Sequence, residues 1–305
     1  MPNKLILVGD NPFNGVSHIS RERSLLRDGN ILNAKYAAEL VVTSVNNGAN
    51  GFTFTISEKT LSILQEVNST KRLFKLALYP LLPNVNEFVR TAGAAGGLPG
   101  LAKDIAKKMS SVMDFQLLGN GIRGVIGNDP ASLLKAYLKY EYIRLQNIIK
   151  KGDNLRLASI LLHEIVTDMA LALDMQWLFR THIALMRRLK LQPGFETRNL
   201  PLLVKQFNKW QIDYKGLVIE SPFNPIGFQM CPSKIDCENA LRATHGSELI
   251  AFSVLAAGYV KLPQAIDYIN TLSEINGIAI GVSNEKQATE TFSLTAKKFA
   301  PMKNT

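Results

Sequence analysis

The sequence predicts a closed (β/α)8 barrel, an α/β fold of eight parallel strands each followed by a helix, and three observations favour it. Eight short apolar segments recur along the 305 residues, and a helical pattern is available after each of them. Such alternation is typical of a parallel sheet. Eight units favour a barrel over an open doubly wound sheet, and the first turn lacks the glycines of a dinucleotide-binding fold. We therefore expect residues 1–305 to form a single domain.

Each predicted strand is bounded by turn, cap or proline residues. The eight strands are Leu5–Val8, Gly51–Ile56, Phe74–Tyr79, Ala158–Leu162, Leu191–Phe195, Gly216–Ile219, Leu249–Val254 and Gly277–Val282. The proline after Tyr79 is expected to end the third strand. Helices are predicted at about 31–47, 57–67, 130–150 and 169–189, with Ser57, Asp129 and Asn199 as N-caps.

Residues 83–155 interrupt the regular alternation of strands and helices. This stretch holds a Gly-rich break, AGAAGGLPG, and a second Gly-rich loop, GNGIRGVIGNDP. Long loops in a compact barrel usually serve as lids or as oligomer contacts. We expect an insertion of one of these kinds between strands three and four.

Composition narrows the function classes. A net charge of +10 is spread along the chain without a basic block or a nucleic-acid-binding module, so a nucleic-acid partner is not expected. No apolar run approaches the roughly 20 residues of a membrane span. The apolar stretch at the N-terminus is too short for a signal peptide. These features predict a cytoplasmic protein with a small-molecule ligand. The two cysteines, Cys231 and Cys237, form no CxxC pattern and are expected to be reduced thiols.

Chemistry in this fold is carried at the carboxyl ends of the strands. The polar residues predicted there are Asp10, Asn11, Thr53, Thr55, Tyr79, His163, Glu164, Glu196, Glu220, Asn224, Ser283 and Asn284. His163 is the sharpest candidate because it ends the apolar strand ASILLHE. Each residue also has a purely structural interpretation: Asp10 and Asn11 can build a turn, and Glu196 can cap a helix or lie in solvent.

The last strand and its turn, GIAIGVSNEKQA, predict an anion-binding site. The loops after strands seven and eight commonly bind phosphate in this fold. Ser283, Asn284 and the free N–H groups of the helix start would face Gly258, which allows close approach of a ligand. The alternative is that Ser283 or Asn284 only caps the helix. Glu285 favours that alternative, because its carboxylate would repel a phosphate.

The second half of the chain resembles an aldo/keto reductase barrel. LRLASILLHE, GLVIESPFNP, ELIAFSVLAAG and GIAIGVSNEKQATETF resemble the fourth, sixth, seventh and eighth strands of that family in order and spacing. The resemblance implies that His163 is the catalytic histidine and that a nicotinamide cofactor binds with its phosphate at the last turn. Of the family's Asp, Tyr, Lys and His, only the histidine is matched. Thr55 lies near the aspartate position, and Phe223 is the one candidate for the nicotinamide-stacking aromatic.

These observations lead to three hypotheses. The first is a divergent barrel enzyme acting on a small anionic metabolite, phosphorylated or carboxylated. His163 would be its acid/base group, and Asp10, Glu196 and Glu220 would orient hydroxyls or a metal. The second is a metal-dependent sugar isomerase or aldolase, with a divalent cation held by the same carboxylates. The third is a non-catalytic binding barrel whose partner surface is the 83–155 insertion.

Overall fold

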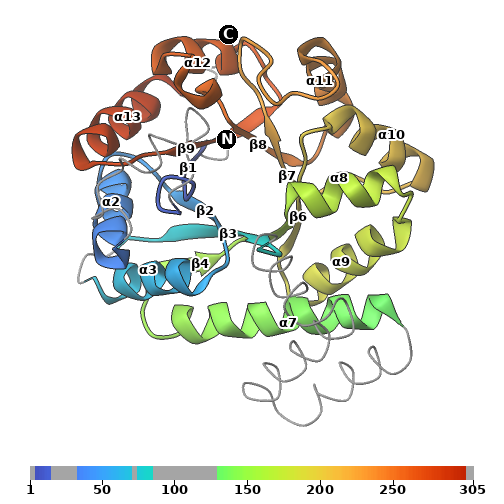
Figure 1. The fold of residues 1–305 in the computed structure, drawn as a ribbon, viewed down its shortest axis with the longest axis horizontal. Coiled ribbons are helices and arrows are strands. Elements are labelled where there is room, and N and C mark those ends of the chain that lie inside the picture. The colour runs from blue at the N-terminus through green and yellow to red at the C-terminus, as the bar shows by residue number, and fades with distance from the viewer. Residues whose placement is uncertain (1–3, 15–32, 71–73, 85–128, 300–305) are drawn as a thin grey trace.

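A closed barrel of parallel strands forms the centre of the molecule, and helices surround it (Figure 1). The computed structural model describes residues 4–14, 33–70, 74–84 and 129–299. The strands are β1 Leu5–Gly9, β2 Gly51–Thr55, β3 Leu76–Leu82, β4 Leu155–Leu157, β5 Ser159–Leu162, β6 Gln192–Glu196, β7 Val218–Pro222, β8 Glu248–Phe252 and β9 Ile275–Gly281. β4 and β5 are two parts of the fourth barrel strand, and β2–β3 pairing closes the ring. β9 pairs with both β1 and β8, as the sequence predicted for the closing strand.

Three of the described helices, α3, α7 and α10, begin where the sequence places their caps. The described helices are α2 Ala34–Asn46, α3 Glu58–Ser69, α7 Pro130–Ile149, α8 Glu164–Ala172, α9 Gln176–Arg188, α10 Leu200–Trp210, α11 Lys234–Leu241, α12 Leu262–Asn270 and α13 Glu285–Lys298. Ser57, Asp129 and Asn199 each accept a hydrogen bond from a backbone N–H of the first turn. A local rule therefore predicted these helix starts, because a cap needs no tertiary contact.

The third strand does not end at Tyr79, so that prediction was wrong. β3 continues through Pro80 to Leu82. Proline is tolerated in a strand where the hydrogen-bond ladder is irregular. The pairing from Leu78↔Leu157 to Leu81↔Leu161 takes one more residue on the fourth strand than on β3, so a bulge lies beside Pro80.

The single helix expected at 169–189 is also wrong. The chain forms α8 and α9, separated by a turn in which Asp174 adopts a left-handed φ of 56°. The carboxylate of Asp174 accepts hydrogen bonds from Lys209 and from the Trp210 indole, which hold the turn against α10. These contacts are tertiary, and the helical pattern of residues 169–189 gives no sign of them.

The second half of the expected 83–155 insertion is ordinary barrel structure. α7 packs between α3 and α9, where the third barrel helix belongs. Residues 85–128 lie outside the described residues, so the expected lid or oligomer contact stays a prediction. No helix in the described part of the chain has the length and apolar character of a membrane span.

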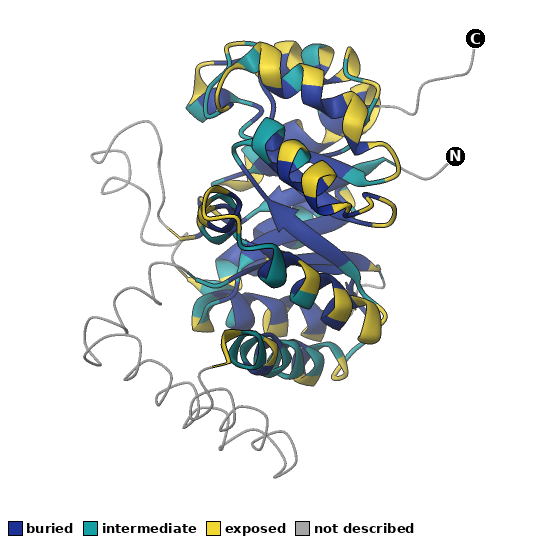
Figure 2. Ribbon diagram, turned by 90° about the vertical axis from the view of Figure 1, so that its right-hand side faces the viewer, coloured by how far each residue is buried: buried dark blue, intermediate teal, exposed yellow. Residues whose placement is uncertain are grey.

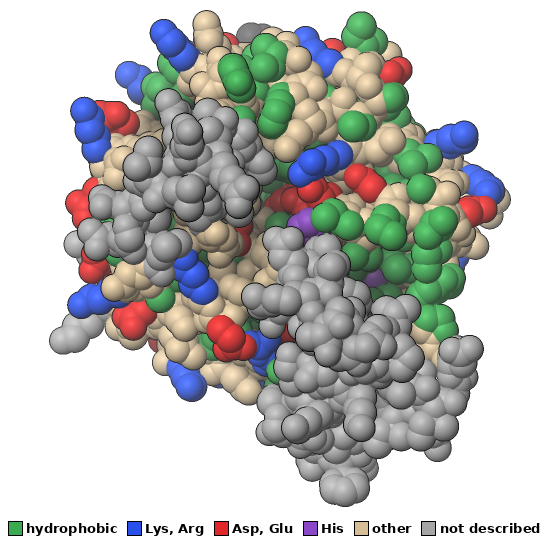
Figure 3. Space-filling model, viewed as in Figure 1, with side chains coloured by type: hydrophobic (Ala, Val, Ile, Leu, Met, Phe, Trp, Pro, Cys, Tyr) green, Lys and Arg blue, Asp and Glu red, His purple; other side chains and the backbone are tan. Residues whose placement is uncertain are grey.

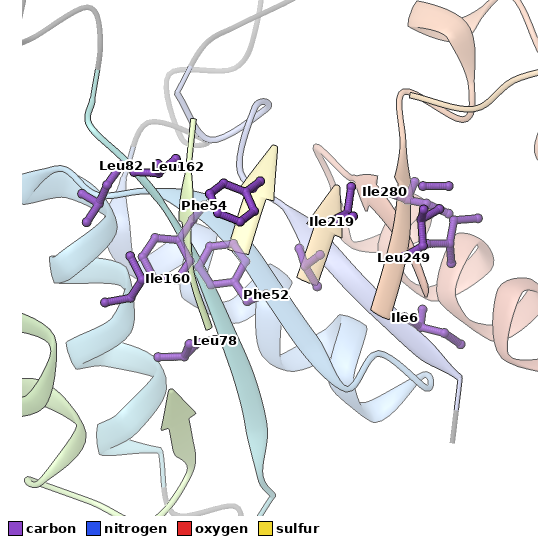
Figure 4. Packing of buried hydrophobic residues seen from close by; sticks show 14 of the residues in the cluster. Ile6, Phe52, Phe54, Leu78, Leu82, Ile160, Leu162, Ile219, Leu249 and Ile280 are labelled. Atoms are coloured by element: carbon purple, nitrogen blue, oxygen red, sulfur yellow. The ribbon is translucent and has the colours of Figure 1, made fainter. Parts of the chain in front are cut away.

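Two apolar cores follow from the alternation of side chains along the strands. The outer core lies between the barrel and its helices, and Figure 4 shows part of it, including Phe52 and Phe54, whose ring centroids lie 4.7 Å apart. The smaller inner core fills the barrel and includes Leu7, Leu161 and Ile250. Figure 2 shows the buried strands between helices whose outer faces are exposed. The packed interior leaves the carboxyl ends of the strands as the place for a site.

Candidate functional site

Acidic side chains converge at the carboxyl ends of the strands. Asp10 follows β1, Glu164 follows β5, Glu196 ends β6 and Glu220 lies within β7. All four are at most 8 % exposed. Figure 3 shows Asp and Glu side chains gathered beside a histidine near the middle of one face of the molecule. Four of the predicted catalytic or binding residues therefore form one cluster, which we call the acidic cluster.

Glu220 is the most deeply buried member, with 1 % of its surface exposed. Its Oε2 accepts a hydrogen bond of 3.2 Å from the Thr53 hydroxyl of β2, so the side chain reaches across the barrel interior. Its Oε1 has no hydrogen-bond partner among the described residues. Burial raises the pKa of Glu220 to about 8, and the nearby Asp10 carboxylate also acts in this direction. Glu220 is therefore largely protonated at neutral pH.

Glu196 lies beside Glu220 in the sheet, because the two residues are direct partners in the β6–β7 pairing. Its Oε2 accepts a hydrogen bond of 2.9 Å from the backbone N–H of Glu164, at the start of α8. Burial raises the pKa of Glu196 well above its usual value, and the charges of Glu164 and Glu220 raise it further. Two glutamates side by side with little neutralising charge are an unfavourable arrangement in a strand pair.

His163 is positioned by the helix that it caps. Its Nδ1 accepts a hydrogen bond of 3.2 Å from the Ile165 N–H, so the neutral ring carries its proton on Nε2. Burial, together with the positive charge of Arg198, lowers the pKa of His163 to about 4. At neutral pH the residue is therefore an uncharged imidazole with an Nε2–H donor.

Arg198 is a site residue that the sequence reasoning missed. Its Nε donates to Glu164 at 2.6 Å, and its Nη2 forms an ion pair with the same carboxylate. The backbone N–H of Arg198 donates to Asp168 at 3.1 Å, and Asp168 also accepts from the Thr197 hydroxyl. The signal was available, since Thr197 and Arg198 directly follow Glu196 at the strand end. Arg198 neutralises Glu164 but makes no hydrogen bond to Glu196 or Glu220.

Asp10 is held by the second strand and by its own loop. Its Oδ2 accepts hydrogen bonds from the Thr55 backbone N–H at 2.8 Å and from the Asn14 amide at 2.7 Å. Burial raises the pKa of Asp10 to about 6, although these hydrogen bonds and the charge of Lys59 oppose the increase. Thr55 thus contributes through its backbone, and Asn11 lies exposed in the turn.

Two predicted ligand-binding residues lie apart from the acidic cluster. Tyr79 is 2 % exposed in the inner core, and its hydroxyl donates to Glu248 at the amino end of β8. The Asn224 amide bonds to both backbone groups of Phe228 and to the Ser253 carbonyl, which joins the loops after β7 and β8. Their direct roles in ligand binding stay predictions.

At the last turn, the cap interpretation is realised. Asn284 accepts a hydrogen bond of 2.8 Å from the Gln287 N–H, and the Ser283 N–H donates to the Gln287 side chain at 2.9 Å. Gly258, with a φ of 93°, follows Ala256 and Ala257, which also have positive φ values. The anion-binding site expected here stays a prediction, with part of its donors already used within the protein.

Within the described part of the chain, the candidate residues do not fit the nicotinamide cofactor that the family resemblance implies. Phe223 is 0 % exposed and packs in the outer core, so its ring cannot stack on a ligand at the strand ends. The donors of Ser283 and Gln287 at the expected phosphate position are bonded within the protein. We therefore derive no reaction step through a nicotinamide.

The metal-dependent alternative rests on carboxylates held close enough to share a cation. Within residues 4–14, 33–70, 74–84 and 129–299, no three His, Cys, Asp or Glu side chains form a group that could hold a metal ion. Both cysteines are free thiols, Cys231 exposed and Cys237 buried. A bound divalent metal stays a prediction.

Comparison with known proteins identifies the architecture. No protein-family profile and no curated protein matches the chain. Two solved structures, each described as a "putative aldo-keto reductase" from Pseudomonas aeruginosa, are similar to it at 12 % identity. One has a TM-score of 0.57 and the alignment covers 98 % of this chain and 94 % of that one, and the other has a TM-score of 0.55 with 96 % and 90 % covered. The chain therefore has an aldo-keto reductase-like (β/α)8 barrel fold.

Proposed function

We propose that the chain is a barrel enzyme that transfers protons on a small metabolite at the carboxyl ends of its strands. Isomerisation or elimination next to a carbonyl is the reaction class that fits. The observation that carries the proposal is the neutral His163 beside buried carboxyls whose pKa values are raised toward neutrality. An efficient proton-transfer group has a pKa near the working pH, and Asp10, at about 6, and Glu220, at about 8, bracket it.

The residues have separate roles in this proposal. His163 donates from Nε2 to an oxygen on which negative charge develops, since its Nδ1 is occupied by the Ile165 N–H. Asp10 or Glu220 takes up or delivers the proton. Hydride transfer has less support. Phe223, the candidate for stacking on a nicotinamide, packs in the outer core, and the donors of Ser283 and Gln287 are hydrogen-bonded within the protein. The expected phosphate or carboxylate of the substrate stays a prediction and belongs to the turn at Ser283 and Asn284.

The substitution His163→Asn tests the role of the imidazole. An asparagine oxygen can still accept from the Ile165 N–H, so the cap of α8 and the stability are expected to be retained. Turnover of a substrate found by screening is expected to fall by roughly 10²–10⁴-fold, the usual contribution of an acid–base group. Initial rates and unfolding in urea are measured together.

The matched control is His245→Ala, an exposed histidine before the amino end of β8. It is expected to leave turnover unchanged. A His163→Asn enzyme that works within about tenfold of the wild-type rate contradicts the proposed role.

A further inference from the structure

Among the residues that the structure describes, five acidic groups and few cations surround the barrel mouth. The acids are Asp10, Glu164, Asp168, Glu196 and Glu220. Lys59 lies near Asp10, and its amine donates to the Phe13 carbonyl. Arg198 pairs with Glu164. The described residues therefore give Glu220 no cationic partner, and Glu196 feels only the charge of Arg198, whose effect on its pKa is smaller than the effects that raise it.

Glu220 carries a second, independent sign of a missing partner. Its Oε1 is buried and unpartnered, whereas its Oε2 is held by Thr53. A buried polar atom without a hydrogen bond costs about 1–3 kcal/mol. Side chains at such positions in native proteins usually have a partner, so this oxygen calls for one that the described residues do not supply.

The sheet register makes the arrangement specific. Glu196 and Glu220 are direct partners on β6 and β7, and both point to the same side of the sheet. A cationic nitrogen with two or three N–H donors can bridge two adjacent carboxylates. A metal ion is the less suitable bridge, because no third ligand from His, Cys, Asp or Glu completes a group in the described part of the chain.

We propose that the acidic cluster binds the cationic nitrogen of a small ligand, an amine or guanidine group, between Glu196 and Glu220. This inference rests on the proposed site and names its substrate class. The ligand replaces protons that the glutamates otherwise hold, so its binding releases protons and leaves Asp10, of the two candidates, as the proton-transfer group of the proposed reaction. Glu164, Asp168 and Arg198 flank Glu196, and Asp10 flanks Glu220. His163 is neutral near pH 7 and does not compete with the ligand's charge.

The test uses pairs of probes that differ in one group, a cationic amine in place of a neutral hydroxyl. Glucosamine is compared with glucose, and serinol with glycerol, at matched ionic strength in thermal-shift and calorimetric titrations of the full chain. We expect only the amine of each pair to raise the melting temperature. Calorimetry in buffers of different ionisation enthalpy is expected to show proton release, and amine affinity is expected to increase between pH 6 and 8. No turnover is needed, so the outcome is separate from that of the His163 experiment.

Glu220→Gln and Glu196→Gln test the two carboxyls. Each keeps the shape of the side chain and is expected to weaken amine binding at least tenfold, and Glu220→Gln is expected to remove most of its pH dependence. Glu285→Gln, an exposed acid at the start of α13, is the matched control and is expected to have no effect. The proposal is overturned if amine and hydroxyl probes give equal shifts. It is equally overturned if both variants bind amines as the wild type does, or if only Mg²⁺, Mn²⁺ or Zn²⁺ stabilises the chain.

Discussion

Two hydrogen bonds cross the barrel interior, and they differ in how their carboxyl groups are compensated. Near the mouth, Thr53 of β2 donates to Glu220 of β7. One layer nearer the amino ends of the strands, Tyr79 of β3 donates to Glu248 of β8 at 3.1 Å. Burial raises the pKa of Glu248, and the hydrogen bond from Tyr79 and the positive charge of Arg156 oppose the increase. Within the described residues no cation acts on Glu220 in this way, and one of its oxygens has no hydrogen-bond partner.

The two hydrogen bonds differ in role: one fits a contribution to stability, and the other fits a functional site. The hydrogen bond from Tyr79 to Glu248, which we call the lower link, lies toward the amino ends of the strands, where residues of this fold usually serve stability. The hydrogen bond from Thr53 to Glu220, which we call the upper link, leaves the other Glu220 oxygen buried without a partner, and the fold alone does not explain this cost. Such uncompensated groups are typical of sites that are completed by a ligand. Changes to the two links should therefore have different consequences.

The largest expected effect is the pH dependence caused by Glu220. Its pKa is about 8 in the folded chain against an ordinary value of 4.5, so between these pH values the folded chain binds a proton that the unfolded chain has lost. The free energy of unfolding therefore falls as the pH rises through this window. Glu220→Gln removes this contribution, which is on the order of 3–5 kcal/mol between pH 4.5 and pH 9.

Urea unfolding at pH 5, 7 and 9 measures this effect. The interval from pH 7 to pH 9 lies above the pKa of Asp10, which is about 6, so Asp10 contributes little there. Glu196, whose pKa is also raised, is present in both proteins, so the difference between the wild type and Glu220→Gln reports Glu220. Glu248→Gln at the lower link is the control and should flatten the pH dependence less. Identical slopes for the wild type and Glu220→Gln would show that Glu220 is not a protonated buried acid.

The next largest effect on the free energy of unfolding is expected when the donor of either hydrogen bond, Thr53 or Tyr79, is removed. Thr53→Val leaves both oxygens of Glu220 without a partner and should cost about 1–2 kcal/mol at pH 7, and more at pH 9, because hydrogen bonds to a charged carboxylate are stronger. Tyr79→Phe should cost about 1 kcal/mol, since Glu248 keeps the field of Arg156. Unfolding of both variants at the two pH values provides the measurement. Equal costs that do not change with pH would remove the distinction between the links.

The smallest effect on the free energy of unfolding is expected at the turn that begins α13. Asn284→Ala removes the N-cap of α13 and should cost about 1 kcal/mol, whereas Asn284→Ser keeps a cap and should cost little. Melting temperatures with and without inorganic phosphate are compared for both variants. A phosphate response that is lost in both would identify the turn as an anion-binding site. An unchanged response leaves it as a cap.

Much of the barrel was predictable because its signals are local. Eight apolar segments, the caps Ser57, Asp129 and Asn199, and the strand-closing role of residues 277–282 follow from periodicity and turn chemistry, which act within a few residues. The strand-end rule placed Asp10, His163, Glu164, Glu196 and Glu220 in advance, because the ends of parallel strands meet at one face.

Contacts between distant segments decided the rest. The bulge beside Pro80 and the break at Asp174 depend on partners dozens of residues away, so no local pattern predicts them. The sequence could name Glu220 as a strand-end acid. Only the closed barrel brings it against Thr53 and beside Glu196, where no cation of the described residues acts on its pKa. The pKa of a carboxyl depends on burial and on neighbouring charge, and both are properties of the folded chain.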